Sequence, residues 1–97
     1  MNENVFIEKI SLDKNGILSI APKNGSFEFI YRSATGVRWN ENKRCLFHKL
    51  SVDDVSVLWL YKEILSAIKS EYGVILKISP ETIFENLNSS NITDIKG

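Results

Sequence analysis

The 97-residue chain has one cysteine, one histidine and no net charge, because twelve basic residues balance twelve acidic ones. The single cysteine, Cys45, cannot form an internal disulfide, which is typical of proteins in reducing compartments. One cysteine and one histidine cannot supply the four ligands of a Cys/His metal site, and we expect no metal or cofactor. The balanced charge gives no global attraction to nucleic acid or to an anionic membrane.

Long apolar runs are also missing, since none approaches the ~20 residues that a membrane-spanning helix requires. The opening MNENVFIEKI lacks the basic start and long apolar core of a secretory signal peptide. The sequence therefore predicts a cytoplasmic protein. Its length suits one domain over residues 1–87, followed by a polar, frayed tail at 88–97.

Known catalytic and nucleotide-binding motifs are absent, including the phosphate loop, the dinucleotide fingerprint and the nucleophile elbow. His48 is the one imidazole that could act as an acid or base, and Cys45 is the one thiol. They are three residues apart on a predicted strand, so we expect their side chains on opposite faces and expect neither to be needed for an activity. We interpret His48 as a strand-surface residue and Cys45 as a small core residue.

The chain does contain a series of short strand patterns separated by turn signals. Asn-Gly pairs at 15–16 and 24–25 are typical of hairpin turns, because both positions tolerate positive φ. We expect a bulge near Glu8 and Lys9, where the apolar phase changes. The predicted strands cover residues 4–12, 17–21, 27–32, 37–39 and 44–49.

A helical pattern follows, with an N-cap at Ser51 and a stop at Gly73. Residues 74–78 read as a further strand, and residues 80–87 as a short helix that begins at a proline. The predicted fold class is therefore α+β: an antiparallel β-meander sheet with one long helix packed on one face, then a further strand and a short C-terminal helix.

Basic residues are concentrated between residues 31 and 50. Strand alternation predicts that four of them share one open face of the sheet: Arg32, Arg38, Arg44 and His48. They could be ordinary solubilising residues that pair with nearby glutamates, or a site for an anion or an acidic protein, because arginine suits bidentate contacts with carboxylate or phosphate. Nucleic acid is not expected, because a sheet that reads single strands needs exposed aromatic rings.

Two further surfaces are candidates. Trp59, with Val55 one turn earlier, lies on the polar side of the predicted helix, which favours a two-fold contact and a homodimer. Alternatively, the indole covers the methylenes of Lys62 and Glu63, or the segment around Phe84 covers it. A pocket between helix and sheet would be lined by Trp39, Tyr61 and Tyr72 and would favour a small-molecule ligand.

A set of residues between about Phe27 and Leu87 carries a resemblance to a known group: Tyr31, Arg32, Ala34, Gly36, Val37, Trp39, Glu71, Tyr72, Gly73, Thr82 and Phe84. The chain resembles small orphan proteins encoded on bacterial integron-type mobile gene cassettes. The resemblance implies a compact α+β fold and a bacterial, horizontally mobile origin, and such proteins are often oligomeric. It brings no assigned activity and no catalytic residues.

We therefore interpret the chain as a small cytoplasmic binding or interaction module of open specific role, without membrane partners and with a homodimer expected. The alternative is a small-molecule, nucleic-acid or anion binder that uses the basic sheet face. An enzyme without a recognisable motif is a third alternative.

Overall fold

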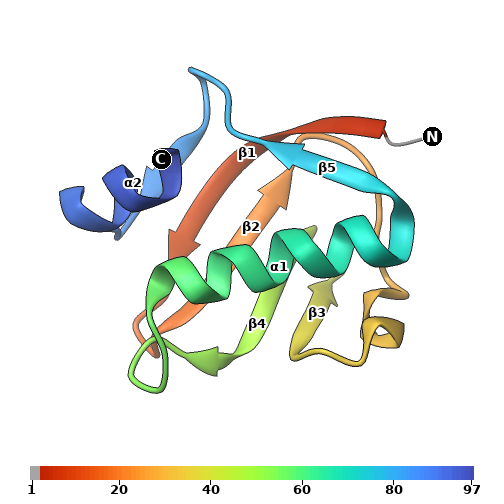
Figure 1. Ribbon diagram of the computed structural model, residues 1–97, viewed down its shortest axis with the longest axis horizontal. Helices are drawn as coiled ribbons and strands as arrows, with labels where there is room; N and C mark the ends of the chain where they lie inside the picture. The colour runs from red at the N-terminus through yellow and green to blue at the C-terminus, as the bar shows by residue number, and fades with distance from the viewer. Residues whose placement is uncertain (1–2) are drawn as a thin grey trace.

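The computed structural model describes residues 3–97, which form one mixed sheet with a long helix across one face (Figure 1). The strand order is β3-β4-β2-β1-β5, and β6 also pairs with β1. The expected α+β class is confirmed. The strands are β1 Glu3–Leu12, β2 Ile17–Pro22, β3 Val37–Asn40, β4 Cys45–Ser51, β5 Val74–Lys77 and β6 Ile83–Glu85; the helices are η1 Ile30–Ser33, α1 Val57–Tyr72 and α2 Ser89–Lys96.

The sheet is antiparallel from β1 through β2 and β4 to β3, while β5 and β6 run parallel to β1. The chain passes from β4 through α1 and returns to the far edge of the sheet as β5 (Figure 1). The expected bulge is confirmed by a register shift between Ile7 and Lys9, which keeps Ile7 and Ile10 both in the core. The strand expected at 74–78 is confirmed as β5.

The strand expected at residues 27–32 is wrong, because this segment contains the 3-10 turn η1. β2 pairs directly with β4, so the sheet has no place between them for a further strand. The segment instead packs beneath the end of α1, where the Phe29 N–H donates to the Tyr72 hydroxyl at 3.0 Å and Ile30 is fully buried. Burial does not follow the alternation: Phe27 and Ile30 are buried, while Phe29 and Tyr31 are exposed.

The N-terminus of α1 also differs from the expectation. Ser51 still belongs to β4 and pairs with Ile17, so it cannot cap a helix. Ser56 is the cap, and its hydroxyl accepts from the Trp59 N–H at 3.1 Å. The predicted stop at Gly73 is confirmed, since this residue has a left-handed backbone, φ 67°.

The short helix expected at 80–87 is misplaced, and the tail expected to fray is ordered. Thr82 donates its hydroxyl to the Ile7 carbonyl at 2.6 Å and anchors the following residues beside β1 as strand β6. The short C-terminal helix lies later, as α2, where the Asn88 side chain accepts from the Asn91 N–H at 2.8 Å. Ile95 of α2 packs into the main core cluster.

The core lies between α1 and the face of the sheet that α1 covers. Its fully buried aliphatic side chains come from the strands and from α1: Ile10, Leu18, Ile20, Leu46, Leu60, Ile64 and Ile68. Burying each such side chain contributes roughly 1.5–3 kcal/mol to folding. Within residues 3–97, no helix has the length and apolar character to cross a membrane.

Candidate functional site

An open groove of about 490 Å³ lies between the first half of α1 and the sheet edge formed by β3 and β4. Its walls are residues 34–36, Arg38, residues 48–50, and Trp59 and Glu63 of α1. We call it the His48 groove. It brings together residues that the sequence assigned to two separate surfaces: Arg38 and His48 from the expected basic face, and Trp59 from the expected dimer contact.

His48 is the most unusual residue of this groove, because its side chain is buried with only 2% of its surface exposed. Its Nδ1 accepts the Leu50 N–H at 3.2 Å, so the proton of the neutral ring is on Nε2. Nε2 is buried and has no hydrogen-bond partner among the described residues. An unsatisfied buried donor costs about 1–3 kcal/mol.

The strand register explains why His48 is buried. In the antiparallel pair β3–β4, Val37 stands opposite His48, and paired residues share a face of the sheet. Val37 is fully buried on the face that packs against α1, so His48 also points toward α1. The expected phase of β4 was therefore reversed, and our interpretation of His48 as a surface residue is wrong.

Two neighbours hold the imidazole ring. A Cβ built on Gly36 would lie 2.6 Å from His48 Cε1, so only glycine lets the backbone approach the ring this closely. The Trp59 ring lies 5.5 Å from the imidazole centroid to centroid. The resemblance to integron cassette proteins had included Gly36, but the reason for glycine is visible only in this contact.

The environment of His48 also affects its protonation. Burial lowers the pKa of the imidazole below its ordinary value; the negative charge of Glu63 raises it by less, and the positive charge of Arg38 lowers it slightly. The ring is consequently neutral at neutral pH. It presents a buried N–H donor and no charge.

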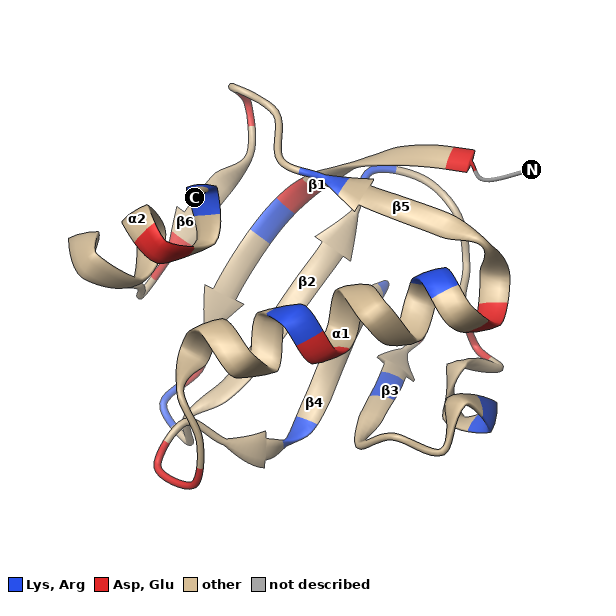
Figure 2. Cartoon of the chain, viewed as in Figure 1, with Lys and Arg blue, Asp and Glu red and all other residues tan. Residues whose placement is uncertain are grey.

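The four residues expected on one basic face do not share one. Arg32 is on η1 and stacks over the Phe29 ring at 4.9 Å. Arg38 is on β3, an edge strand, and its Nη1 donates to the Thr35 and Val37 carbonyls, both at 2.8 Å. Figure 2 shows basic residues spread over α1, β1, β3 and β4 instead of gathered on one face.

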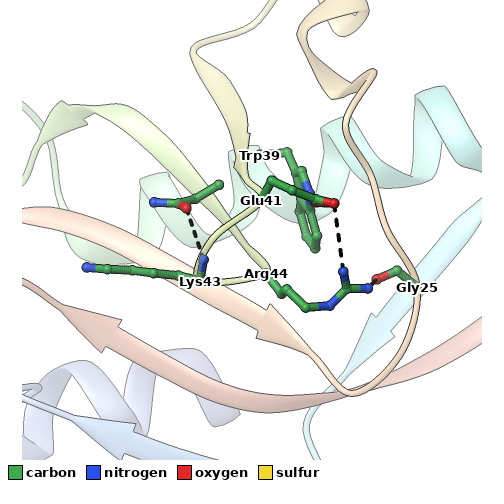
Figure 3. A network of polar contacts seen from close by, with 6 residues as sticks. Gly25, Trp39, Glu41, Lys43 and Arg44 are labelled. Carbon is green, nitrogen blue, oxygen red and sulfur yellow. Dashed lines mark hydrogen bonds and ion pairs between the residues drawn. The ribbon is translucent and has the colours of Figure 1, made fainter.

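Arg44 lies in the turn between β3 and β4, where it adopts φ 51°. Its guanidinium donates to the Gly25 carbonyl at 3.1 Å, lies 3.9 Å from a Glu41 carboxylate oxygen, and approaches the Trp39 ring at 6.0 Å (Figure 3). These contacts join the turn to the loop after β2. Arg44 is therefore committed to local structure, and Arg38 alone of the three arginines borders the His48 groove.

Cys45 and His48 lie on opposite faces of β4, as expected. Cys45 is buried, with 6% of its surface exposed, and burial raises the pKa of its thiol against a smaller opposite effect of the Ser19 side chain. Ser19 belongs to the sheet face away from α1, because its neighbours Leu18 and Ile20 face the core.

Trp59 lies on the solvent side of α1 with 43% of its surface exposed, as the helical wheel predicts. Its ring packs against His48, which none of the three alternatives for its environment had included. Val55 precedes α1 and is partly buried against the core. The homodimer stays a prediction.

The three aromatic residues expected to line a pocket have other neighbours. Trp39 and Tyr72 both pack edge-to-face on Phe27, with ring centroids 5.6 Å and 5.0 Å away. Phe27 thus fills the space between them. Tyr61 is buried in the core, where burial raises the pKa of its phenol.

Comparisons with known proteins give one family. The family model of integron cassette protein Hfx_Cass5 matches residues 3–82. A solved structure of integron cassette protein Hfx_Cass5, from the mobile metagenome of the North West Arm sewage outfall, is 29% identical; the match covers 99% of this chain and 94% of that chain, with a TM-score of 0.49. No curated protein matches the chain.

Proposed function

Because this chain belongs to the Hfx_Cass5 family of integron cassette proteins, a family of unassigned function, we propose a role from its groove geometry. The protein is a small, non-catalytic binding module, and the His48 groove holds a carboxylate next to an apolar group. The family expected from the sequence is confirmed, whereas the binding role and the cytoplasmic location are our proposal.

The observation that carries this proposal is the buried Nε2–H of His48, which lacks an acceptor. An oxygen that reaches it would form a hydrogen bond and remove a cost of about 1–3 kcal/mol. Nε2 is shielded from solvent, so the ligand has to displace a neighbouring side chain. Trp59 is the exposed residue in ring contact with His48 and can move without disturbing the core.

The surroundings favour an acid with an apolar body. Arg38 and Lys49 outnumber Glu63 in the groove wall, which favours an anion over a cation. Trp59 and Leu50 expose 43% and 40% of their surfaces there and offer an apolar contact. A volume of about 490 Å³ falls within the range of ligand pockets, roughly 300–1,000 Å³.

The test is a titration with benzoate, with benzamide as the neutral analogue of the same shape. NMR signals of the Trp59 indole and the His48 ring should shift in a saturable way with benzoate and less with benzamide. His48→Phe keeps an aromatic ring but removes the donor, so it should abolish binding, while the matched control Lys62→Gln on the outer side of α1 should not. Equal benzoate binding by the His48→Phe variant contradicts the proposal.

We propose self-association as a second role, because two of the exposed large apolar side chains, Trp59 and Leu50, border the same groove. A two-fold contact would bury both of them in each subunit. Sedimentation velocity should show a dimer at micromolar concentration that Trp59→Ala weakens by about 2 kcal/mol or more, as for a central interface tryptophan. A wild-type monomer at high concentration, or a dimer unaffected by Trp59→Ala, contradicts this role.

A further inference from the structure

A second and larger cavity lies on the other side of the sheet. It has a volume of about 780 Å³, and its floor is formed by short side chains of β1, β2 and β4. Ser11 pairs directly with Ser19, and both alternate with core residues, so both point away from α1. Short side chains on three adjacent strands leave this face hollow.

Three lysines border this cavity: Lys9 of β1, Lys14 of the β1–β2 turn and Lys43 of the β3–β4 turn. We call it the lysine cleft. The positive charges of Lys9 and Lys43 both act on the Cys45 thiol, and each lowers its pKa against the larger effect of burial. Lys9, Lys43 and Cys45 all line this one cavity.

Two carboxylates, Asp13 and Glu85, also line the cleft, so its three lysines leave a net charge of one positive unit. The Asp13 carboxylate accepts the Asn15 and Ile17 N–H groups, both at 2.9 Å, and so serves the turn. Glu85 lies 3.9 Å from Lys9 in an exposed ion pair. Lys14 and Lys43 have no carboxylate within 4 Å in the described part of the chain.

We propose that the lysine cleft binds a small molecule with two anionic groups. β1 and β4 are separated by one strand and lie about 10 Å apart; Lys9 is on β1, and Lys43 is in the turn that leads into β4. One anionic group contacts each lysine, and the hydroxyls of Ser11 and Ser19 donate to the ligand between them. The sequence had predicted an anion site of arginines on an open sheet face; this cleft is built from lysines of other strands and turns.

The experiment titrates the full chain, labelled with ¹⁵N, at constant ionic strength with two probes, pyrophosphate and succinate. At least one should produce saturable shifts at the amides of Ser11, Ser19 and Cys45, and should slow alkylation of Cys45 by iodoacetamide. A response to one probe alone identifies the ligand class as diphosphate or dicarboxylate, and a response to both identifies the shared charge pattern. If neither pyrophosphate nor succinate produces saturable shifts, the proposal is overturned.

Charge-matched variants separate a specific site from general attraction. Lys9→Gln and Lys43→Gln should each weaken binding about fivefold, the upper range for an exposed charge contact. Lys62→Gln removes the same charge from α1 and should leave binding unchanged. All three positions are on the surface, and the spectra show whether each variant is folded. Equal weakening by Lys62→Gln overturns the proposal.

Discussion

Replacing Gly36 by alanine should destabilise the protein through a single contact. The added Cβ would lie 2.6 Å from Cε1 and 3.0 Å from Nδ1 of His48, closer than side-chain carbons approach in folded proteins. The backbone of Gly36 is not among the positive-φ positions, so alanine adds no backbone strain. The whole cost therefore comes from crowding against the imidazole.

The imidazole has little freedom to yield. It is buried, and the Leu50 N–H holds its Nδ1. Overpacking of a well-packed site costs about 1–3 kcal/mol, and we expect Gly36→Ala to lower the free energy of unfolding by this amount. If His48 is first replaced by alanine, the space opens, and Gly36→Ala should then be neutral or stabilise by about 0.4–1 kcal/mol, because it restricts the unfolded chain.

The two substitutions form a double-mutant cycle with an expected coupling of about 2 kcal/mol. Urea unfolding followed by far-UV circular dichroism gives the four free energies, and an unchanged slope against urea shows that the denatured states are comparable. If Gly36→Ala costs the same with and without the imidazole, the reasoning is refuted. An unaffected single variant refutes it as well.

Two further predictions concern buried polar groups. Burial lowers the pKa of His48 in the folded protein, so the unfolded chain binds the proton more tightly; the stability is fully present above about pH 6.5 and falls as the pH drops toward the folded-state pKa. Urea titrations across this range should show the fall in the wild type and a smaller one in His48→Phe, and equal profiles would contradict the assignment. The Thr82 hydroxyl donates to the Ile7 carbonyl at 2.6 Å and accepts the Ser79 N–H at 2.9 Å, so Thr82→Val should cost about 2 kcal/mol in thermal or urea unfolding. Thr82→Ser keeps the hydroxyl and should cost less; equal losses would show that the hydrogen bonds are not responsible.

Local chemistry made several elements predictable. The first hairpin forms where the Asn-Gly pair predicts it, although only Gly16, and not Asn15, has a positive φ. The bulge in β1 follows from the change of apolar phase at Lys9. Gly73 ends α1 because its left-handed backbone suits glycine. These features depend on residues within a few positions of one another, and for that reason the sequence alone indicates them.

Other elements depended on partners far away in the chain. Residues 27–32 alternate like a strand, yet β2 and β4 pair directly and leave this segment to pack against α1. Residues 80–87 carry a helix start, yet the hydrogen bond from Thr82 to Ile7, 75 positions away, directs them to the sheet. In both segments a long-range contact outweighed a local preference.

The candidate site also combines a feature that the sequence determines with one that long-range contacts determine. Alternation along β4 determines that Cys45 and His48 point to opposite faces, and this was readable from the sequence. Which face is buried depends on the pairing of Val37 with His48 and on the face that α1 covers. A shift of one residue in that register would exchange the two faces, so only the tertiary structure decided that the histidine lies inside, beside Gly36 and Trp59, and that the cysteine lies at the floor of the lysine cleft.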